Sequence, residues 1–296
     1  MYQGCVAGPV PAQALDGRAL AKRIEAELTA EVADLSSRFG KAPGLAVVLV
    51  GEDPASQVYV RRKQEACGRV GIESREHVLP VETSEDALVG LIEKLNRDAD
   101  INGILVQLPL PAHIDEKRVI HAITPYKDVD AFHPESVGNA LIGDDRMAPC
   151  TPQGIMLLLE AAGIDLRGAE AVVVNHSNIV GKPLAALLIN RDATVTVCHK
   201  HTRDLVAHTR RADVVVTATG VPGLITAAHV KSGAVVVDVS MNRVDGKLVG
   251  DCAQDVWDVA GWVTPVPGGV GPMTISVLLQ NTVRSFKRKM GLLPAP

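Results

Sequence analysis

Aromatic side chains are scarce in this chain of 296 residues, because Phe, Trp and Tyr together make up only 3% of it. Surfaces that stack the bases of single-stranded nucleic acid need such rings. The 30 Lys and Arg residues are outnumbered by 34 Asp and Glu residues, so the formal net charge is -4 and the basic excess of a nucleic-acid binder is missing. No apolar run approaches the roughly 18 residues of a membrane span. We therefore expect neither a nucleic-acid nor a membrane partner.

Cysteines are few and scattered, and they form no Cys-x-x-Cys pair. The five are Cys5, Cys67, Cys150, Cys198 and Cys252. An odd, dispersed set is typical of reduced thiols rather than of a disulfide framework. The segment from Met1 to Pro11 lacks a basic flank ahead of an apolar run, and so has no secretory signal. The sequence predicts a cytoplasmic protein.

Hydrophobic residues are abundant, at 47% of the chain, which is enough to form two ordinary cores. Short apolar runs in the first half predict parallel strands at residues 45–50, 77–79 and 101–108. Helical spacing and N-terminal capping residues predict helices at residues 17–38, 54–68 and 84–96.

Strands and helices alternate again in the second half, after a stretch from about Thr124 to Thr151 that is rich in Pro and Gly and is expected to be mostly loop. Strands are predicted at residues 171–175, 193–197, 213–218, 234–239 and near 263. Helical segments are predicted to begin near Pro183, Thr202 and Ala227, and a last helix to cover 273–289. Strands separated by helices of this length form parallel βαβ units, so we expect two α/β domains.

Tyr59 and Lys63 lie four residues apart on a predicted helix and therefore on one face of it. A partly desolvated lysine beside a phenol can transfer protons. A surface lysine next to an amphipathic tyrosine would have the same spacing, and the residues alone leave both interpretations open.

Gln107 is a lone amide near the carboxyl end of an otherwise apolar strand, where open α/β sheets bind ligands. It must find a partner, either in the loop backbone or in a ligand. Asp128 and Asp130 alternate with an apolar residue in a loop, a pattern that also suits solvated or turn-capping carboxylates.

A strand over residues 171–174 runs into a turn that ends at Gly181, and Lys182-Pro183 then opens a helix. This is the order of the first unit of a dinucleotide-binding domain, although the turn lacks the Gly-x-Gly-x-x-Gly pattern. The next strand ends in the cationic stretch Cys198–Arg203, where NAD-binding domains usually place an acid. A cationic pocket favours the 2′-phosphate of NADP. His199 and His201 lack a third ligand, so we expect no metal site.

Six runs of residues occur in the order found in the bifunctional methylenetetrahydrofolate dehydrogenase/methenyltetrahydrofolate cyclohydrolase family, and the chain resembles this family from about Leu15 to Val283. The runs are Val50–Tyr59, Gly103–Pro111, Lys127–Asp130, Pro149–Gly154, Ser177–Pro183 and Thr264–Thr274. The resemblance implies two α/β domains with a cleft between them. A folate-binding catalytic domain would comprise residues 1–148 with the C-terminal helix 274–296, and a Rossmann-like, doubly wound dinucleotide-binding domain residues 149–273.

The resemblance also implies a reaction in two steps. NADP+ oxidises 5,10-methylenetetrahydrofolate to the methenyl form, and water then opens this form to 10-formyltetrahydrofolate. The reaction belongs to one-carbon metabolism and purine biosynthesis, and the family implies a homodimer. The alternative cofactor is NAD+.

Roles carried over from the family make Lys63 the main catalytic residue. Tyr59 would stack beside the folate, Gln107 would hold and tune Lys63, and Asp130 would bind the pterin. The implied substrate contacts are Tyr59, Gln107, Leu108, Asp130, Pro267, Gly268 and Gly269. The implied dinucleotide contacts are Asn175, His176, Ser177, Ile179, Val180, Lys200, Arg203, Thr219, Ser240, Gly271 and Thr274.

The departures from the family pattern gather in the dinucleotide half. Asn175-His176 stands where many members have Gly-Arg, and Ser240 stands where they have Gly. We expect Lys200, with Arg203 or His176, to replace the missing arginine. A cyclohydrolase that has lost efficient dehydrogenase activity is the nearest alternative. A shikimate-dehydrogenase-like enzyme would share the two-domain plan, but the Tyr59/Lys63 spacing argues against it.

Overall fold

The computed structural model describes residues 11–293, and the expectation about the first ten residues lies outside this range. The chain divides into two compact units. We name each unit after the ligand that the family resemblance leads us to expect. The folate unit contains residues 21–150 and 274–293, and the dinucleotide unit contains residues 11–20 and 151–273. Residues 11–20, which the family resemblance groups with the folate-binding domain, cluster with residues 151–273 in the structure. Their strand β1 (Gln13–Ala14) pairs with β11 (Trp262–Val263) of the dinucleotide unit.

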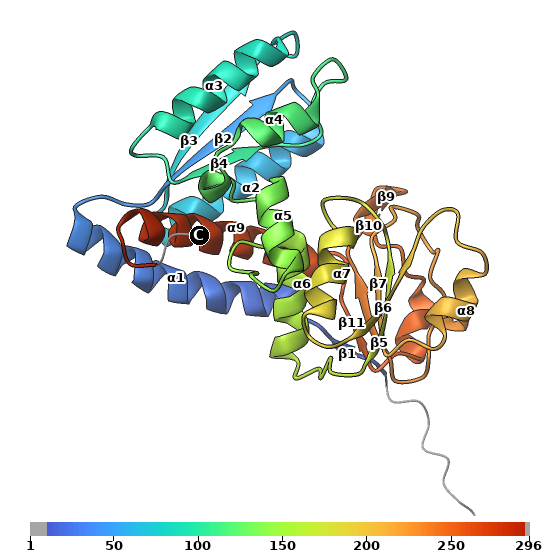
Figure 1. The fold of residues 1–296 in the computed structure, drawn as a ribbon. Coiled ribbons are helices and arrows are strands. Elements are labelled where there is room, and N and C mark those ends of the chain that lie inside the picture. The colour runs from blue at the N-terminus through green and yellow to red at the C-terminus, as the bar shows by residue number, and fades with distance from the viewer. Residues whose placement is uncertain (1–10, 294–296) are drawn as a thin grey trace, which may run out of the picture. The chain divides into compact units, whose positions relative to one another are not determined.

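The folate unit is built on a parallel sheet with the strand order β3-β2-β4 (Figure 1). Its strands are β2 (Gly44–Val50), β3 (Glu73–Leu79) and β4 (Gly103–Val106). The central strand β2 is buried along its whole length, which explains its unbroken apolar run. The connecting helices are α2 (Pro54–Val70), α3 (Glu85–Arg97) and α4 (Glu116–Ala122). Leu88, Ile92 and Leu95 of α3 pack into the core under this sheet.

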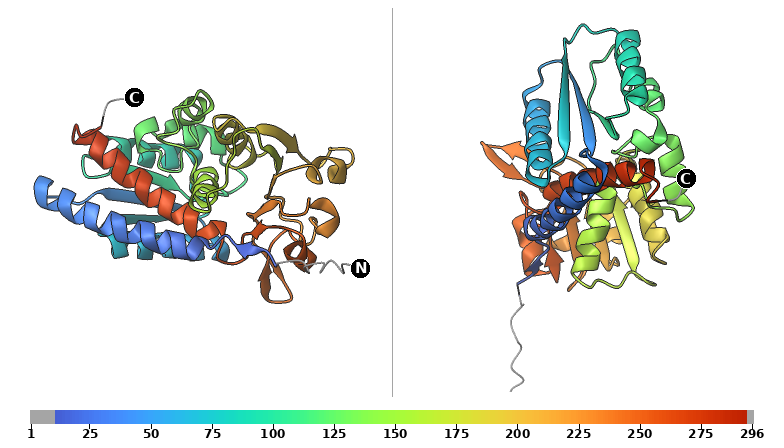
Figure 2. Two further views of the ribbon diagram at one scale, coloured as in Figure 1. Left: turned by 90° about the horizontal axis from the view of Figure 1, so that it is seen from below. Right: turned by 90° about the vertical axis from the view of Figure 1, so that its left-hand side faces the viewer.

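Two long helices lie side by side along the folate unit, as both views in Figure 2 show. They are α1 (Gly17–Phe39) and α9 (Val270–Lys289), each of which has one end in the dinucleotide unit. The rings of Phe39 and Phe286 meet edge to face at 5.9 Å, and Lys287 pairs with Glu31 at 2.7 Å. No helix in the described part of the chain combines the length and the apolar character that a membrane crossing requires.

The dinucleotide unit holds a parallel sheet with the order β1-β11-β8-β7-β5-β6. Its longer strands are β5 (Glu170–Val174), β6 (Thr194–Cys198), β7 (Val214–Thr217) and β8 (Val235–Asp238). Its helices include α6 (Cys150–Ala161), α7 (Gly181–Ile189) and α8 (Leu205–Thr209). The chain leaves β5 for β6 on one side and then returns to β7 on the other. This reversal creates a topological switch point at the carboxyl ends of β5 and β7.

Several local predictions were wrong. Within the stretch from Thr124 to Thr151, where mostly loop was expected, the structure has η1 (Pro125–Lys127), α5 (Pro134–Leu141) and the start of α6, and α5 was not predicted. The helix expected near Ala227 is only the 3₁₀ turn η2 (Ala227–His229). A hairpin of β9 (Asn242–Val244) and β10 (Lys247–Val249) was not predicted, although its turn residues Asp245-Gly246 have positive φ angles and are a strong hairpin signal.

Candidate active site

Helix α2 carries two of the predicted catalytic residues, Tyr59 and Lys63. The Asp53 side chain caps the helix by accepting a hydrogen bond from the backbone N–H of Ser56 at 2.7 Å, and Pro54 occupies the first turn. Gly71, with φ of 84°, ends the helix in the left-handed conformation that glycine adopts without strain. These signals at both ends fix the helix and therefore place Tyr59 and Lys63 on one face.

Lys63 is buried, with only 8% of its surface exposed, and its Nζ atom donates to Oε1 of Gln107 at 3.2 Å. Strand β4 ends at Val106, so Gln107 is the first residue of the following loop and not part of the strand as predicted. Its Nε2 atom donates to the carbonyl oxygen of Leu108 at 2.6 Å. Burial excludes the interpretation of Lys63 as a surface lysine.

Tyr59 is 37% exposed, one turn of helix before Lys63. Partial burial raises the pKa of its phenol above the ordinary value, and the charge of Arg62 opposes this shift. The phenol is therefore neutral at physiological pH, and its ring offers a flat, partly exposed surface.

Asp128 belongs to a segment that runs beside β4, because Asp128 and Ile104 form an isolated parallel bridge. Gly103 permits this close approach: a Cβ atom there would lie 2.6 Å from Cγ1 of Val129. The Asp128 carboxylate accepts the backbone N–H groups of Ala131 at 3.1 Å and His133 at 2.6 Å. Burial raises its pKa to about 7. Asp128 thus caps the turn that follows Asp130.

Asp130 lies within the electrostatic reach of Lys63, and its carboxylate shares a hydrogen bond with the thiol of Cys150. Burial raises the pKa of Asp130, whereas the charge of Lys63 and the Cys150 hydrogen bond oppose the rise. Burial and the nearby Asp130 raise the pKa of the Cys150 thiol well above its usual value, so the thiol is a neutral donor. The folate unit thus brings Lys63, Gln107 and Asp130 together.

Cys150 and Asn281 are two members of this constellation that the sequence analysis missed. The Cys150 thiol lies 3.2 Å from the carbonyl oxygen of Val129, and Nδ2 of Asn281 donates to the same oxygen at 2.9 Å. Cys150 stood inside one of the six recognised runs but was interpreted as a packing residue. Asn281 sits in a helix with no motif around it, and its only signal is an amide in a mostly apolar stretch.

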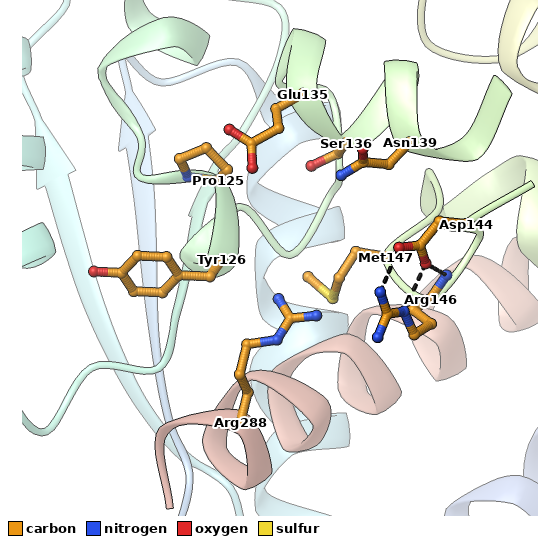
Figure 3. A pocket seen from close by; sticks show the side chains of 9 residues that line it. All are labelled: Pro125, Tyr126, Glu135, Ser136, Asn139, Asp144, Arg146, Met147 and Arg288. Carbon is orange, nitrogen blue, oxygen red and sulfur yellow. Dashed lines mark hydrogen bonds and ion pairs between the residues drawn. The ribbon is translucent and has the colours of Figure 1, made fainter. Parts of the chain in front are cut away.

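A small pocket elsewhere in the folate unit contains none of these residues (Figure 3). Arg288 extends into it from α9, and the ion pair of Arg146 with Asp144 stands on its other side. Its volume of about 20 Å³ suits a single water molecule. A pterin does not fit, so this pocket is not a second folate site.

The predicted dinucleotide contacts from Asn175 to Val180 all lie in the loop between β5 and α7. The first turn of α7 offers few donors to a phosphate, because the N–H of Gly181 donates to Oδ1 of Asn175 and that of Lys182 to the carbonyl of Ser177. Pro183 has no N–H. The backbone at the N-terminus of this helix therefore leaves few N–H groups for a phosphate, and side chains must supply much of the positive field.

Histidine, lysine and arginine side chains gather at the carboxyl ends of β5 and β6. The ring of His176 lies 4.9 Å from that of His199, which in turn lies 6.0 Å from the ring of His201. Lys200 and Arg203 are exposed in the same turn. No acid precedes Asp204 there, so the side chains suit an extra phosphate better than a free ribose hydroxyl. Across the described residues, no group of three or more His, Cys, Asp or Glu side chains has metal-binding geometry.

The remaining predicted contacts lie in several places. Thr219 and Ser240 follow β7 and β8 in the dinucleotide unit, and Gly271 and Thr274 lie in the first turns of α9. The segment Pro267–Gly269 packs against the start of α1 within the dinucleotide unit: the N–H of Arg18 donates to the Gly268 carbonyl at 3.0 Å. A Cβ atom on Gly17 would lie 1.8 Å from the Gly269 carbonyl oxygen, so only glycine fits there.

Comparison with known proteins accounts for this combination of residues. Residues 15–130 match the family model described as "Tetrahydrofolate dehydrogenase/cyclohydrolase, catalytic domain". Residues 149–290 match the model described as "Tetrahydrofolate dehydrogenase/cyclohydrolase, NAD(P)-binding domain". The chain belongs to the tetrahydrofolate dehydrogenase/cyclohydrolase family. It is 59% identical over 281 residues to the bifunctional protein FolD of Moorella thermoacetica, an alignment that covers 94% of this chain and 100% of the relative.

Solved structures of the family have nearly the same fold as this chain. The FolD methylenetetrahydrofolate dehydrogenase/cyclohydrolase of Campylobacter jejuni has a TM-score of 0.92 and 47% identity, covering 94% of this chain and 99% of that one. The Trypanosoma brucei enzyme, complexed with NADP cofactor and an inhibitor, has a TM-score of 0.91 and 41% identity, covering 95% and 99%.

The predicted family, the two-domain α/β fold class and the enzyme class are therefore confirmed. The chain is a bifunctional methylenetetrahydrofolate dehydrogenase and methenyltetrahydrofolate cyclohydrolase of one-carbon metabolism, and NADP+ is its cofactor. The roles of individual residues and the predicted domain boundaries stay predictions.

Proposed function

We propose that Lys63 is the catalytic residue of the cyclohydrolase step and that Gln107, Asp130 and Tyr59 complete a folate site around it. The observation that carries this proposal is the buried Nζ atom of Lys63, held at 3.2 Å by Oε1 of Gln107 within reach of the Asp130 carboxylate. Buried, paired titratable groups of this kind gather at functional sites.

The hydrolysis step requires a group that takes a proton from water. Water adds to the cationic methenyl carbon, a carbon–nitrogen bond of the five-membered ring then breaks, and 10-formyltetrahydrofolate results. Lys63 in its amine form accepts the proton without placing a second positive charge beside the cation. Oε1 of Gln107, by accepting from Nζ, keeps the nitrogen in place during this step.

Folate binding depends on complementary polar groups around this amine. The Asp130 carboxylate accepts hydrogen bonds from the amino group and the ring nitrogen of the pterin, and Cys150 fixes its orientation. The partly exposed ring of Tyr59 stacks beside the folate, and Leu108 lines the site. We include Pro267, Gly268 and Gly269 among the substrate contacts.

Bound NADP+ supplies the nicotinamide C4 that accepts hydride from the one-carbon bridge. The task of the protein in this step is to bind, orient and exclude water. Lys200, with Arg203 or His176, neutralises the 2′-phosphate. Other contacts come from the β5–α7 loop, from the residues after β7 and β8, and from the start of α9. They are Ser177, Ile179, Val180, Thr219, Gly271 and Thr274, and Asn175 and Ser240 support the loops that carry them.

We also propose a cytoplasmic homodimer that supplies formyl groups for purine biosynthesis. The compartment is supported by the cysteines: the four in the described part of the chain, Cys67, Cys150, Cys198 and Cys252, are all free thiols. The proposals of a homodimer and of a role in purine biosynthesis rest on the family resemblance.

A spectrophotometric assay tests the proposal. Purified protein is given methylenetetrahydrofolate with NADP+ or NAD+. The formation of reduced dinucleotide, methenyltetrahydrofolate and 10-formyltetrahydrofolate is followed over time. Both steps are expected, with NADP+ preferred. Hydrolysis of the methenyl form without any dinucleotide reduction would favour the alternative of a cyclohydrolase that has lost its dehydrogenase. Full hydrolysis by the Lys63→Ala variant would contradict the role of Lys63.

A further inference from the structure

Three loops meet at the switch point of the six-stranded sheet, where the order of β5, β6 and β7 reverses. They follow β5, β7 and β8, three neighbouring parallel strands. Ligands of open α/β sheets bind at this point, outside the carboxyl ends of the strands. The more ordered these loops are before a dinucleotide binds, the less conformational entropy they lose when it binds.

Asn175 ties the first of these loops to the second. Its Oδ1 atom accepts the N–H of Ser177 at 2.7 Å and that of Gly181 at 3.1 Å. Its Nδ2 atom donates to the carbonyl oxygen of Ala218, the residue after β7, at 2.5 Å. One side chain thus closes the turn before α7 and also fixes it to the neighbouring loop. A glycine could do neither.

Ser240 ties the third loop to the second. Its Oγ atom accepts the N–H of Gly220 at 3.0 Å and donates to Oδ2 of Asp251 at 2.9 Å. Asp251 is fully buried, and the same oxygen accepts the N–H and the hydroxyl of Thr219 at 2.6 and 2.8 Å. The loop after β7 is therefore held by side chains on both of its flanks.

Asp251 is itself fixed by the strand that precedes Ser240. Its backbone N–H donates to Oδ1 of Asp238 at 3.0 Å, and Thr217 donates to its carboxylate at 2.8 Å. Gly250 allows the close contact, because a Cβ atom there would lie 2.0 Å from Oδ2 of Asp238. The anchor for Ser240 is thus part of the packed interior and not of a free loop.

We propose that Asn175 and Ser240 are positioning residues that join the three loops into a preformed surface for the dinucleotide. Both occupy positions where the family pattern described above has glycine, and a glycine there would supply none of these connections. The inference rests on the proposed placement of NADP+ at this edge of the sheet. Loops that are already fixed lose less conformational entropy on binding, which favours affinity more than the chemical step.

The test compares Asn175→Ala and Ser240→Ala with the unchanged protein. Loss of a hydrogen-bonding side chain is expected to raise the KM for NADP+ and the Kd for NADPH about 5- to 10-fold for each variant, with kcat of the dehydrogenase within about twofold. The Kd is measured by fluorescence titration without folate. Ser240→Thr keeps the hydroxyl and is expected to restore both constants. Ser232→Ala, at an exposed serine of the same unit, is the matched control.

The cyclohydrolase rate is measured without dinucleotide, together with the melting temperature of each variant. These two measurements show whether a variant has lost its structure in general or only the connections between the loops. If an alanine variant does not fold, Asn175→Gly and Ser240→Gly, which copy the family pattern, replace it. Unchanged Kd and KM in both folded variants, while the unchanged protein binds NADPH, would overturn the inference alone. Absence of NADPH binding by the unchanged protein would instead overturn the proposed dinucleotide site.

Discussion

Nδ2 of Asn281 on α9 donates to the carbonyl oxygen of Val129 at 2.9 Å, and the Cys150 thiol approaches the same oxygen at 3.2 Å. A residue near the end of the chain thus fixes the backbone just before Asp130. The position of the Asp130 carboxylate therefore depends on Cys150 and Asn281, two side chains that need not contact a ligand themselves. This dependence leads to a test on Cys150.

Replacing Cys150 with Ala should shift the pH dependence of the enzyme. The thiol hydrogen bond holds the pKa of Asp130 down, so its loss raises that pKa further. In the proposed role of Asp130, folate binding uses the ionised carboxylate, so the acid limb of the kcat/KM profile is expected to move to higher pH. Cys150→Ser keeps a donor and should retain the original profile. An unmoved limb in Cys150→Ala would show that the thiol does not tune Asp130.

Replacing Lys63 with Met should remove the proton acceptor while keeping an unbranched side chain in its buried place. The cyclohydrolase rate is expected to fall by about 10²- to 10⁴-fold, the usual contribution of a positioned acid or base. Far-ultraviolet circular dichroism should be unchanged. Arg61→Met, at an exposed position of the same helix, is the control. A rate within tenfold of normal would contradict the assignment.

Asp128 should make the folding stability depend on pH. Burial raises its pKa to about 7 from the ordinary 3.8, so the folded state holds a proton that the unfolded state has lost between these values. Its contribution to the free energy of unfolding is therefore present below about pH 4 and is lost as the pH rises through 7. When the free energy of unfolding is measured by urea titration at pH 5 and pH 8, it should fall less between these two pH values in Asp128→Asn than in the unchanged protein. An identical fall would disprove the linkage.

Lys127 should matter for stability rather than for catalysis. Its ammonium group is buried and donates to the carbonyl oxygens of Leu95, Asn96 and Asp98 at 2.9, 2.7 and 2.8 Å, at the C-terminal end of α3. Lys127→Met removes this donor from all three carbonyl oxygens, of which only that of Leu95 keeps a further donor, the N–H of Asp98 at 3.3 Å, among the bonds described. The variant is expected to lower the free energy of unfolding by about 2–4 kcal/mol. Lys117→Met, at an exposed position on α4, should change it by less than about 0.5 kcal/mol.

Lys200 should set the preference between the two dinucleotides. The Lys200→Ser variant removes a cation from the turn after β6, and kcat/KM with NADP+ is expected to fall about tenfold relative to NAD+. The control is Lys247→Ser, at an exposed site on β10. If the NADP+/NAD+ ratio does not change, His176 and Arg203 are the residues to replace next.

The buried strands and capped helices were predictable because their signals are local. Strand β2 is a continuous apolar run, and Asp53-Pro54 and Gly71 mark the ends of α2. Helix α5 was hidden because His133 caps it: its Nδ1 atom accepts the N–H of Glu135, and histidine is not a usual capping residue.

The active-site residues fall into two groups for a similar reason. Lys63, Gln107 and Asp130 came from motifs with a known chemistry, although spacing alone left their roles open. Asn281 contacts Val129 across 152 residues of sequence and Cys150 contacts it across 21, and no local pattern records either contact. The same holds for Asp251, whose carboxylate collects donors from the loops after β7 and β8.

The pairing of β1 with β11 bears on how this enzyme can be dissected. A fragment cut at residues 149 and 273 would leave the edge of β11 bare, and bare strand edges recruit other copies into aggregates. Linking residues 11–20 to that fragment by circular permutation would cover the edge again. Anyone isolating the nucleotide half for biophysics should therefore carry the opening residues of the chain along with it.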